Sequence, residues 1–303
     1  MSEETVRFRS GADECVGVLA RPDNAKGKLP LVIMAGGWCY TKEIVMPHYS
    51  KFFEELGCAT LRFDYRCFGE SSGSPRQHID PWAQIEDYRN AISYAETLDF
   101  IDPAKIGIWG ISYSGGHVLV TAAIDPRPAF AISTIPVVDG FQNMRRVHGE
   151  GNFARLNKAI LDDRRRRAKG EPGAYIPMSS EKPHEEICAW PFPHVYTAFV
   201  GLQKTEAPRH EHRNTIESVE LLTHYKVEPF CRRIVETPVM MTLAAGDNIT
   251  AHDLEVEAFN AIADPTKKFA SVGGLTHMSI YTDKNHLAKV ARIQADWLKG
   301  VVG

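Results

Sequence analysis

The sequence has no long hydrophobic run and no excess of charge of one sign. No apolar stretch approaches the length that spans a bilayer, and the first residues, Met-Ser-Glu-Glu-Thr-Val-Arg, are polar where a secretory signal would be apolar. The formal net charge of the 303 residues is -3, whereas phosphate binding favours a clear surplus of lysine and arginine. We therefore expect neither a membrane nor a nucleic acid as a partner.

Cysteines are few and scattered. The chain has six, none of them in a Cys-x-x-Cys pair or at the spacing of metal ligands. Together with the polar amino terminus, this pattern predicts free thiols and a cytoplasmic protein. We expect no metal site and no cofactor.

The apolar pattern predicts a mostly parallel sheet covered by helices. The first two strands lie close together across Gly11 and Asp13, which predicts an antiparallel hairpin. Eight predicted strands cover residues 5–9, 15–20, 29–34, 59–63, 105–109, 129–135, 239–244 and 268–272. Apolar residues at helical spacing predict helices over residues 46–56, 80–98, 114–123, 253–263 and 287–298.

The alternation of strands and helices breaks once, between residues 139 and 236. This segment has no strand signal, but it carries charge runs, aromatic residues and helical patterns at 157–169 and 215–225. A loop of that length without structure is improbable in a compact domain. We therefore predict a helical cap at 139–236, inserted into a core formed by residues 1–138 and 237–303.

A tight turn follows the strand predicted at 105–109. Its sequence is Gly110-Ile111-Ser112-Tyr113-Ser114-Gly115-Gly116, and an apolar helical stretch follows directly. A nucleophile on such a turn projects its oxygen above the sheet edge, and small neighbours are needed where backbone segments approach closely. Ser112 is therefore the candidate nucleophile. The Tyr113 amide, at the helix start, can donate to a developing oxyanion.

This turn resembles the nucleophile elbow of the cocaine-esterase and X-prolyl-peptidase branch of the α/β-hydrolase superfamily. The resemblance covers the core on both sides of the cap. It implies the α/β-hydrolase fold, with an eight-stranded mostly parallel sheet, helices on both faces and an inserted helical cap. It also implies serine hydrolase activity.

Two further loops extend the resemblance. Residues 35–43, Ala-Gly-Gly-Trp-Cys-Tyr-Thr-Lys-Glu, are similar to the His-Gly-x-Gly-Gly-Thr-Lys-Glu loop of many members, which implies that the Trp38 amide is the second oxyanion donor. Gly36 stands where the family often has histidine. A plain glycine-rich turn is the alternative. Residues 64–71 resemble a structural loop of the superfamily, so Asp64 and Arg66 are assigned to loop bracing.

A hydrolytic serine needs a base, and the base needs an acidic partner that fixes its tautomer. Asp247 and His277 follow the seventh and eighth predicted strands and so lie at the same sheet edge as Ser112. Their order along the chain, serine then aspartate then histidine, is the order of this fold. We predict Asp247 as the acid and His277 as the base.

Rival residues exist for each role. Ser114 is the other serine of the turn, but only Ser112 has glycine two residues before it. Asp253 also follows the seventh strand, although it is typical of a helix cap. The remaining candidate bases are His117, which lies inside a predicted helix, and His252 and His286, which come after the expected acid and base positions.

The cap offers two patterns with open interpretations. The run from Arg164 to Arg167 is either a solvated helix face with intrahelical pairs or a group of cations that faces the cleft and holds an anion. Four aromatic residues either line an acyl pocket or form the core of the cap: Trp190, Phe192, Tyr196 and Phe199. Residues 213–218 resemble a short segment of capped hydrolases related to fungal polyketide transferases.

The combined prediction is a serine hydrolase that cleaves a carboxylic ester or thioester through an acyl-enzyme on Ser112. Its partner is a small-molecule substrate, with a carrier-bound acyl group as one option. The alternatives are an acyltransferase with the same triad, an amidase or peptidase, and a non-catalytic binding protein. The sequence does not identify substrate-binding residues, and it leaves the oligomeric state open, a homodimer included.

Overall fold

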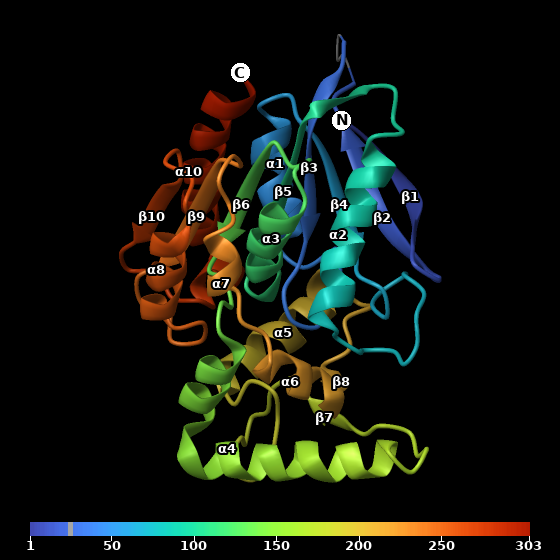
Figure 1. Ribbon diagram of the computed structural model, residues 1–303, viewed down its shortest axis with the longest axis vertical. Coiled ribbons are helices and arrows are strands. Elements are labelled where there is room, and N and C mark those ends of the chain that lie inside the picture. Colours follow the sequence, from blue (N-terminus) through green and yellow to red (C-terminus); the bar gives the residue numbers. More distant parts are fainter. Residues whose placement is uncertain (24–26) are drawn as a thin grey trace.

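The computed structural model describes residues 1–23 and 27–303. Within them, eight strands form one sheet in the order β1-β2-β4-β3-β5-β6-β9-β10 (Figure 1). β1 and β2 pair antiparallel, as do β2 and β4, and the other neighbours are parallel. The strands are β1 (Ser2–Ser10), β2 (Asp13–Arg21), β3 (Leu29–Ala35), β4 (Ala59–Asp64), β5 (Ile101–Ile111), β6 (Phe130–Thr134), β9 (Val239–Ala244) and β10 (Lys268–Val272). The predicted eight-stranded sheet and its opening hairpin are confirmed.

Helices cover both faces of the sheet because its central strands are apolar on both sides. Every residue of β4, β6 and β9 is buried. On the near face in Figure 1 lie α2 (Pro81–Ala95), α3 (Tyr113–Ile124) and α8 (His252–Ala261). On the other face α1 (Met46–Glu54) packs against α10 (Lys284–Val302), which α9 (Ser279–Thr282) precedes. In the part of the chain that is described, no helix is long and apolar enough to cross a membrane.

The segment 139–236 lies beyond the carboxyl ends of the parallel strands (Figure 1). It contains α4 (Gly140–Arg167), β7 (Tyr175–Pro177), α5 (Pro193–Thr205), β8 (Arg213–Thr215), α6 (Ile216–Thr223) and α7 (Glu228–Cys231). α4 packs on α6, whereas α7 packs on α3 and α8 of the core. The division into a cap at 139–236 and a core at 1–138 and 237–303 stays a proposal, which the mutual packing of α4 and α6 supports.

The expectation that this segment has no strand is wrong. β7 and β8 pair antiparallel in a separate two-stranded sheet. Strands of three residues are too short to produce a recognisable alternation of apolar and polar residues. The helix expected at 157–169 is the second part of α4, which is interrupted at Gly149 (φ 64°, ψ 168°).

A buried hydrogen-bond cluster joins α10 to the middle of the sheet. The side chain of Gln294 is fully buried, and its Oε1 accepts a hydrogen bond from Trp109 Nε1 at 2.9 Å. Its Nε2 donates to the hydroxyls of Thr134 and Thr242, each at 2.7 Å. One glutamine therefore connects the helix to β5, β6 and β9.

We expect Gln294→Leu to lower the free energy of unfolding by about 3 kcal/mol, because it leaves a buried indole N–H and two hydroxyls without their partner. Urea unfolding followed by circular dichroism measures the change. The control is Arg292→Ala on the exposed side of α10, which should change the stability by less than about 0.5 kcal/mol. Equal stability of the Gln294→Leu variant and the parent would contradict the assignment.

Candidate active site

Ser112 lies between β5 and α3 in a strained backbone conformation, with φ 58° and ψ -119°. Its amide donates to the carbonyl oxygen of Thr134 at 2.9 Å, and its own carbonyl accepts from the amides of Gly115 at 2.9 Å and Val137 at 3.0 Å. A non-glycine residue persists in such a conformation only when its surroundings fix it. These three bonds supply that constraint.

The glycines of the turn are required by close backbone contacts. A Cβ atom at Gly110 would lie 2.2 Å from the carbonyl oxygen of Ser114, and one at Gly116 would lie 2.3 Å from that of Val137. Any side chain at these positions would displace the turn or the loop after β6. The spacing of small residues in the sequence is therefore a packing requirement of the elbow.

Ser114 is not available for catalysis. Its hydroxyl is fully buried and hydrogen-bonded to the hydroxyls of Tyr65 at 2.8 Å and Tyr88 at 2.7 Å. Tyr88 also donates to the carbonyl oxygen of Trp109 at 2.6 Å and accepts from the amide of Ala35 at 3.1 Å. Ser114 thus belongs to a hydroxyl cluster that fixes the ends of β3 and β5.

Asp247 and His277 come together at the carboxyl ends of β9 and β10. His277 Nδ1 lies 2.8 Å from Asp247 Oδ2, and both side chains are buried. The other carboxylate oxygen accepts the amides of Ile249 at 2.8 Å and Thr250 at 2.9 Å. Burial alone would raise the pKa of the Asp247 carboxyl, but the charge of His277 and these hydrogen bonds hold the pKa below its ordinary value.

The rival acid and bases lie elsewhere. Asp253 is exposed and paired with Arg146 at 2.7 Å. His117 is buried behind the elbow, where its ring nitrogens contact Tyr225 and Gln84, and His252 contacts Ser271. His286 lies on α10, next to Asp283.

Ser112 and His277 line one cavity. Its other walls come from both parts of the chain: Trp38, Tyr40, Met178, Trp190, Val195, Phe199, Ile249 and Met278. The cavity volume is about 20 Å³, which is room for one water molecule. Within the described residues, the Ser112 hydroxyl makes no hydrogen bond to His277, and catalytic hydrogen bonds of this kind often tighten only when substrate binds.

The loop after β3 passes directly beside Ser112. A Cβ atom at Gly37 would lie 3.3 Å from Ser112 Oγ, so only glycine lets the loop approach this closely. Over residues 1–23 and 27–303, no acceptor takes a hydrogen bond from the amide of Trp38 or of Tyr113. The ring of Tyr40 occupies the space that a side chain at position 36 would need. A Cβ atom at Gly36 would lie 2.6 Å from that ring.

Asp64 and Arg66 brace the neighbouring loops, in the way the sequence predicts. Asp64 accepts the amide of Lys42 at 2.7 Å and its ammonium group at 2.8 Å, which fixes the loop after β3. Arg66 Nε donates to the buried carboxylate of Asp87 at 2.8 Å. Neither residue lines the cavity.

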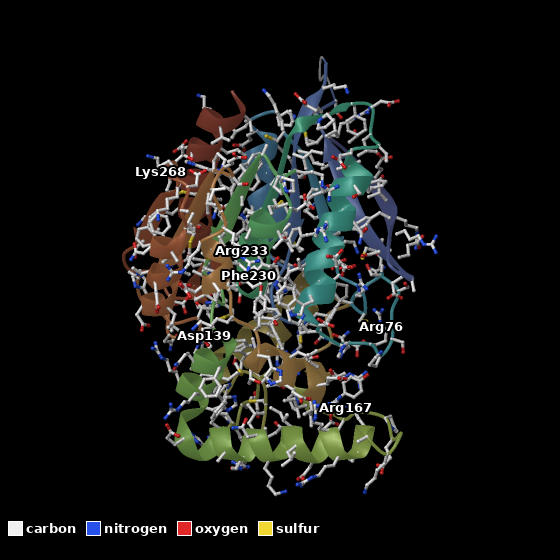
Figure 2. All side chains as sticks on the ribbon, viewed as in Figure 1. Arg76, Asp139, Arg167, Phe230, Arg233 and Lys268 are labelled. Atoms are coloured by element: carbon white, nitrogen blue, oxygen red, sulfur yellow. The ribbon has the colours of Figure 1, made fainter. Side chains whose placement is uncertain are left out.

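The arginine run of α4 is paired within the inserted segment. Arg164 and Arg167 both donate to Glu220 of α6 at 2.6 Å. Figure 2 shows Arg167 near one end of α4, beneath α6. Arg165 pairs with Asp162 at 3.3 Å, and Arg166 pairs with Glu171 at 3.2 Å. None of these four arginines lines the cavity of Ser112, so the anion-site interpretation does not fit the structure. The helix-face interpretation fits in part, because Arg165 pairs within α4, whereas Arg164 pairs with α6 and Arg167 pairs with both helices.

The cap aromatics divide between the two interpretations. Trp190 and Phe199 line the cavity, whereas Phe192 and Tyr196 do not. Phe192 is half-buried, and Tyr196 packs edge-on against His212.

A twisted, mostly parallel sheet with helices on both faces and a serine on a strained turn after β5 defines an α/β-hydrolase. The sequence matches the family model for the X-Pro dipeptidyl-peptidase (S15) family over residues 13–278, and the chain belongs to this family. It is therefore an α/β-hydrolase-type enzyme. The predicted resemblance to this superfamily is confirmed.

Curated relatives and solved structures resemble nearly the whole chain. The quorum-quenching protein AidA of Acinetobacter baumannii is 29% identical and covers 98% of this chain and 94% of its own length. The acyltransferase drtE of Aspergillus calidoustus is 27% identical, with coverages of 92% and 89%. The thiohydrolase aneE of Aspergillus aculeatus is also 27% identical, with coverages of 85% and 78%. The α/β hydrolase GrgF from a Penicillium species has the same fold, with a TM-score of 0.83, 23% identity and coverages of 100% and 99%.

Sequence reasoning missed the side chains behind Asp247. Thr250 Oγ lies 3.4 Å from His277 Nδ1 and donates to Glu255 Oε1 at 2.9 Å. Glu255 is fully buried, and its Oε2 has no partner within the described residues. Burial raises the pKa of this carboxyl well above its ordinary value of 4.5, and the charge of Asp247 raises it further. The only signal in the sequence was a glutamate in the first turn of a helix, which is too common to indicate such a role.

Glu255→Gln should stabilise the protein at neutral pH. A carboxyl whose pKa is raised by folding contributes favourably below its unfolded pKa of 4.5, and this contribution is lost as the pH rises towards the folded pKa. Glutamine keeps the oxygen that Thr250 needs and does not titrate. We expect the free energy of unfolding of the variant, relative to the parent, to increase between about pH 5 and about pH 7, by at most about 1.4 kcal/mol per pH unit. Urea unfolding at both pH values tests this.

The matched control is Glu257→Gln, which changes an exposed carboxyl on the same helix. If the two variants depend on pH in the same way, Glu255 does not remain protonated in the folded protein.

Proposed function

We propose that Ser112 is the nucleophile, His277 the general base and Asp247 its acidic partner. The observation that carries this proposal is the 2.8 Å contact between Asp247 and His277, at a cavity that His277 shares with Ser112. The amides of Trp38 and Tyr113 are the proposed oxyanion donors. Neither amide has an acceptor among the described residues, and the one lies in the loop beside Ser112 and the other at the start of α3, which is what such a site requires.

Asp247 determines which nitrogen of the base reacts. The ionised carboxylate accepts a hydrogen bond from the Nδ1–H group, so Nε2 is left unprotonated and can take the proton of the Ser112 hydroxyl. The lowered pKa of Asp247 keeps the carboxylate charged when His277 becomes a cation during the reaction. The pair thus stabilises the imidazolium without transferring the second proton.

The reaction then proceeds in two halves. Ser112 Oγ attacks the carbonyl carbon while His277 takes its proton, and the two amides stabilise the oxyanion. The tetrahedral intermediate collapses, the alcohol or thiol leaves with the proton from His277, and an acyl-serine ester remains. His277 next removes a proton from water as the water oxygen attacks the ester. The second tetrahedral intermediate collapses, His277 returns the proton to Ser112 Oγ, and the acid is released.

The cavity walls favour a neutral acyl group. In the described chain, the lining residues include His277 but no Asp, Glu, Lys or Arg. A dipeptidyl-peptidase has to bind a free ammonium group, and burying that charge without a carboxylate is costly. In spite of the family name, we therefore propose a neutral ester or thioester as the substrate and not an amino-terminal dipeptide. The buried indole N–H of Trp190 has no partner in the described residues and can donate to an oxygen of the acyl group.

Hydrolysis is the proposed outcome, and acyl transfer to an alcohol or amine is the second candidate. Relatives named thiohydrolase and acyltransferase support one outcome each. The same acyl-enzyme serves both, so the products formed with competing acceptors distinguish them. A carrier-bound acyl group and a homodimer remain proposals. A cytoplasmic location does as well, supported by six buried cysteines that are all free.

Ser112→Ala should abolish covalent labelling by a fluorophosphonate probe and lower kcat by several orders of magnitude. Ser114→Ala is the matched control two residues away. It should retain the labelling, because the Ser114 hydroxyl is bonded to two tyrosines away from the cavity. Labelling and hydrolysis are both measured on the purified variants. Labelling that survives in Ser112→Ala and is lost in Ser114→Ala would overturn the choice of nucleophile.

The proposed substrate class predicts a preference among paired p-nitrophenyl esters. We expect kcat/KM for the neutral butyrate ester to exceed that of the anionic hemisuccinate ester by about 100-fold, because no Lys or Arg among the described lining residues can pair with the free carboxylate. Alanyl-proline p-nitroanilide, which carries a free ammonium group, should be a still poorer substrate. Turnover of this anilide at the rate of the butyrate ester would favour a peptidase instead.

A further inference from the structure

The inserted segment contacts the loop that carries Trp38. The indole Nε1 of Trp38 donates to Asn214 Oδ1 in β8 at 3.0 Å, and both side chains are buried. Asn214 Nδ2 donates to the carbonyl oxygen of Thr215 at 2.9 Å, which fixes the orientation of the amide group. A buried asparagine with both polar atoms bonded has a single well-defined conformation. Asn214 therefore presents a fixed acceptor to Trp38.

Two more contacts hold the next residue of this loop. Cys39 has a left-handed backbone, with φ 61°, which is unfavourable for a residue other than glycine. Its carbonyl oxygen accepts a hydrogen bond from His210 Nδ1 at 3.0 Å, and its thiol donates to the carbonyl oxygen of Arg213 at 3.4 Å. Burial lowers the pKa of His210 to about 4, so the ring is neutral at physiological pH. The strained conformation of the loop is thus stabilised from the inserted segment.

The indole ring also connects the two proposed oxyanion donors. The ring of Trp38 packs edge-on against that of Tyr113, with centroids 5.1 Å apart, and against that of Trp190 at 6.2 Å. A rotation of the indole would therefore disturb both ring contacts, and the hydrogen bond to Asn214 opposes this rotation.

We propose that Asn214 is a positioning residue for the oxyanion hole. It holds the indole of Trp38, and thereby the backbone amide of that residue, at the place where the carbonyl oxygen of the substrate becomes an oxyanion. The inserted segment is then part of the catalytic apparatus as well as a cover. This inference rests on the proposed function, in which the Trp38 amide is an oxyanion donor.

The test is a double-mutant cycle on the full-length protein with the p-nitrophenyl butyrate substrate. Asn214→Leu removes the acceptor, and Trp38→Phe removes the indole donor but keeps the backbone amide. We expect each single variant to lower kcat by about 10-fold to 100-fold, with less than about a threefold change in KM, because a misplaced donor affects the transition state more than the bound substrate. The double variant should be no slower than the slower single variant.

A control separates positioning from folding. Asn157→Leu makes the same chemical change at an exposed position of α4 and should leave kcat unchanged. Thermal unfolding of all variants shows that the protein assayed is folded. Parent-like kcat in both single variants, or multiplicative losses in the double variant, would overturn the proposal.

Failure of this inference is distinguishable from failure of the proposed function. If Ser112→Ala is inactive while Asn214→Leu keeps the parental kcat, only the role of Asn214 is wrong. If Ser112→Ala remains active, the assignment of the nucleophile fails whatever the cycle gives.

Discussion

The backbone of Ser112 is the constraint on which the site depends. A serine at φ 58° exists only because Thr134, Gly115 and Val137 hydrogen-bond its peptide groups. These partners belong to β6, to α3 and to the loop after β6, so the sheet itself fixes the turn. The glycines at 110 and 116 leave room for backbone contacts that any side chain would block. The strained turn is therefore stabilised by hydrogen bonds to the sheet and to α3, and it places the Ser112 hydroxyl above the sheet edge.

Two carboxyl groups, those of Asp247 and Glu255, lie behind this hydroxyl at increasing depth. Asp247 is ionised and held by backbone amides as well as by His277. Glu255 lies behind Thr250, whose hydroxyl donates to it, and burial raises the pKa of its carboxyl well above the ordinary value. Two ionised carboxylates so close together would repel each other in a buried environment. The raised pKa of Glu255 disfavours that repulsion and leaves Asp247 as the charged partner of His277.

Much of the core could be predicted because its signals are local. The apolar runs of β4, β6 and β9 show both buried faces, and the spacing of Gly110, Ser112 and Gly115 shows the elbow. Asp247 and His277 could be placed because residues after parallel strands share one edge of the sheet. The sequence could not reveal partners that meet only through folding. Trp38 and Asn214 are 176 positions apart, and nothing near either residue indicates the other.

The inserted segment was the least predictable part for a related reason. β7 and β8 are short, and they are ordered by their neighbours: the amide of Thr215 donates to Gln77, and that of Ile216 donates to Ala174. The sequence left the arginine run open between a solvated helix face and an anion site, and in the structure Arg164 and Arg167 pair with Glu217 and Glu220 of α6. Tertiary ion pairs between two helices leave no regular spacing in the sequence. Whether a side chain of the inserted segment faces the cavity or only covers the core depends on its direction. A linear sequence pattern does not contain that direction.

The contacts of Trp38 and Cys39 with residues 210–214 also bear on how the protein is made. During synthesis the elbow and the loop after β3 leave the ribosome long before β8, and His277 follows later still. In the proposed mechanism, the nascent chain therefore carries the serine before the proposed oxyanion donors and the proposed base are in place. The proposed reaction thus requires the chain to be extended and folded as far as His277.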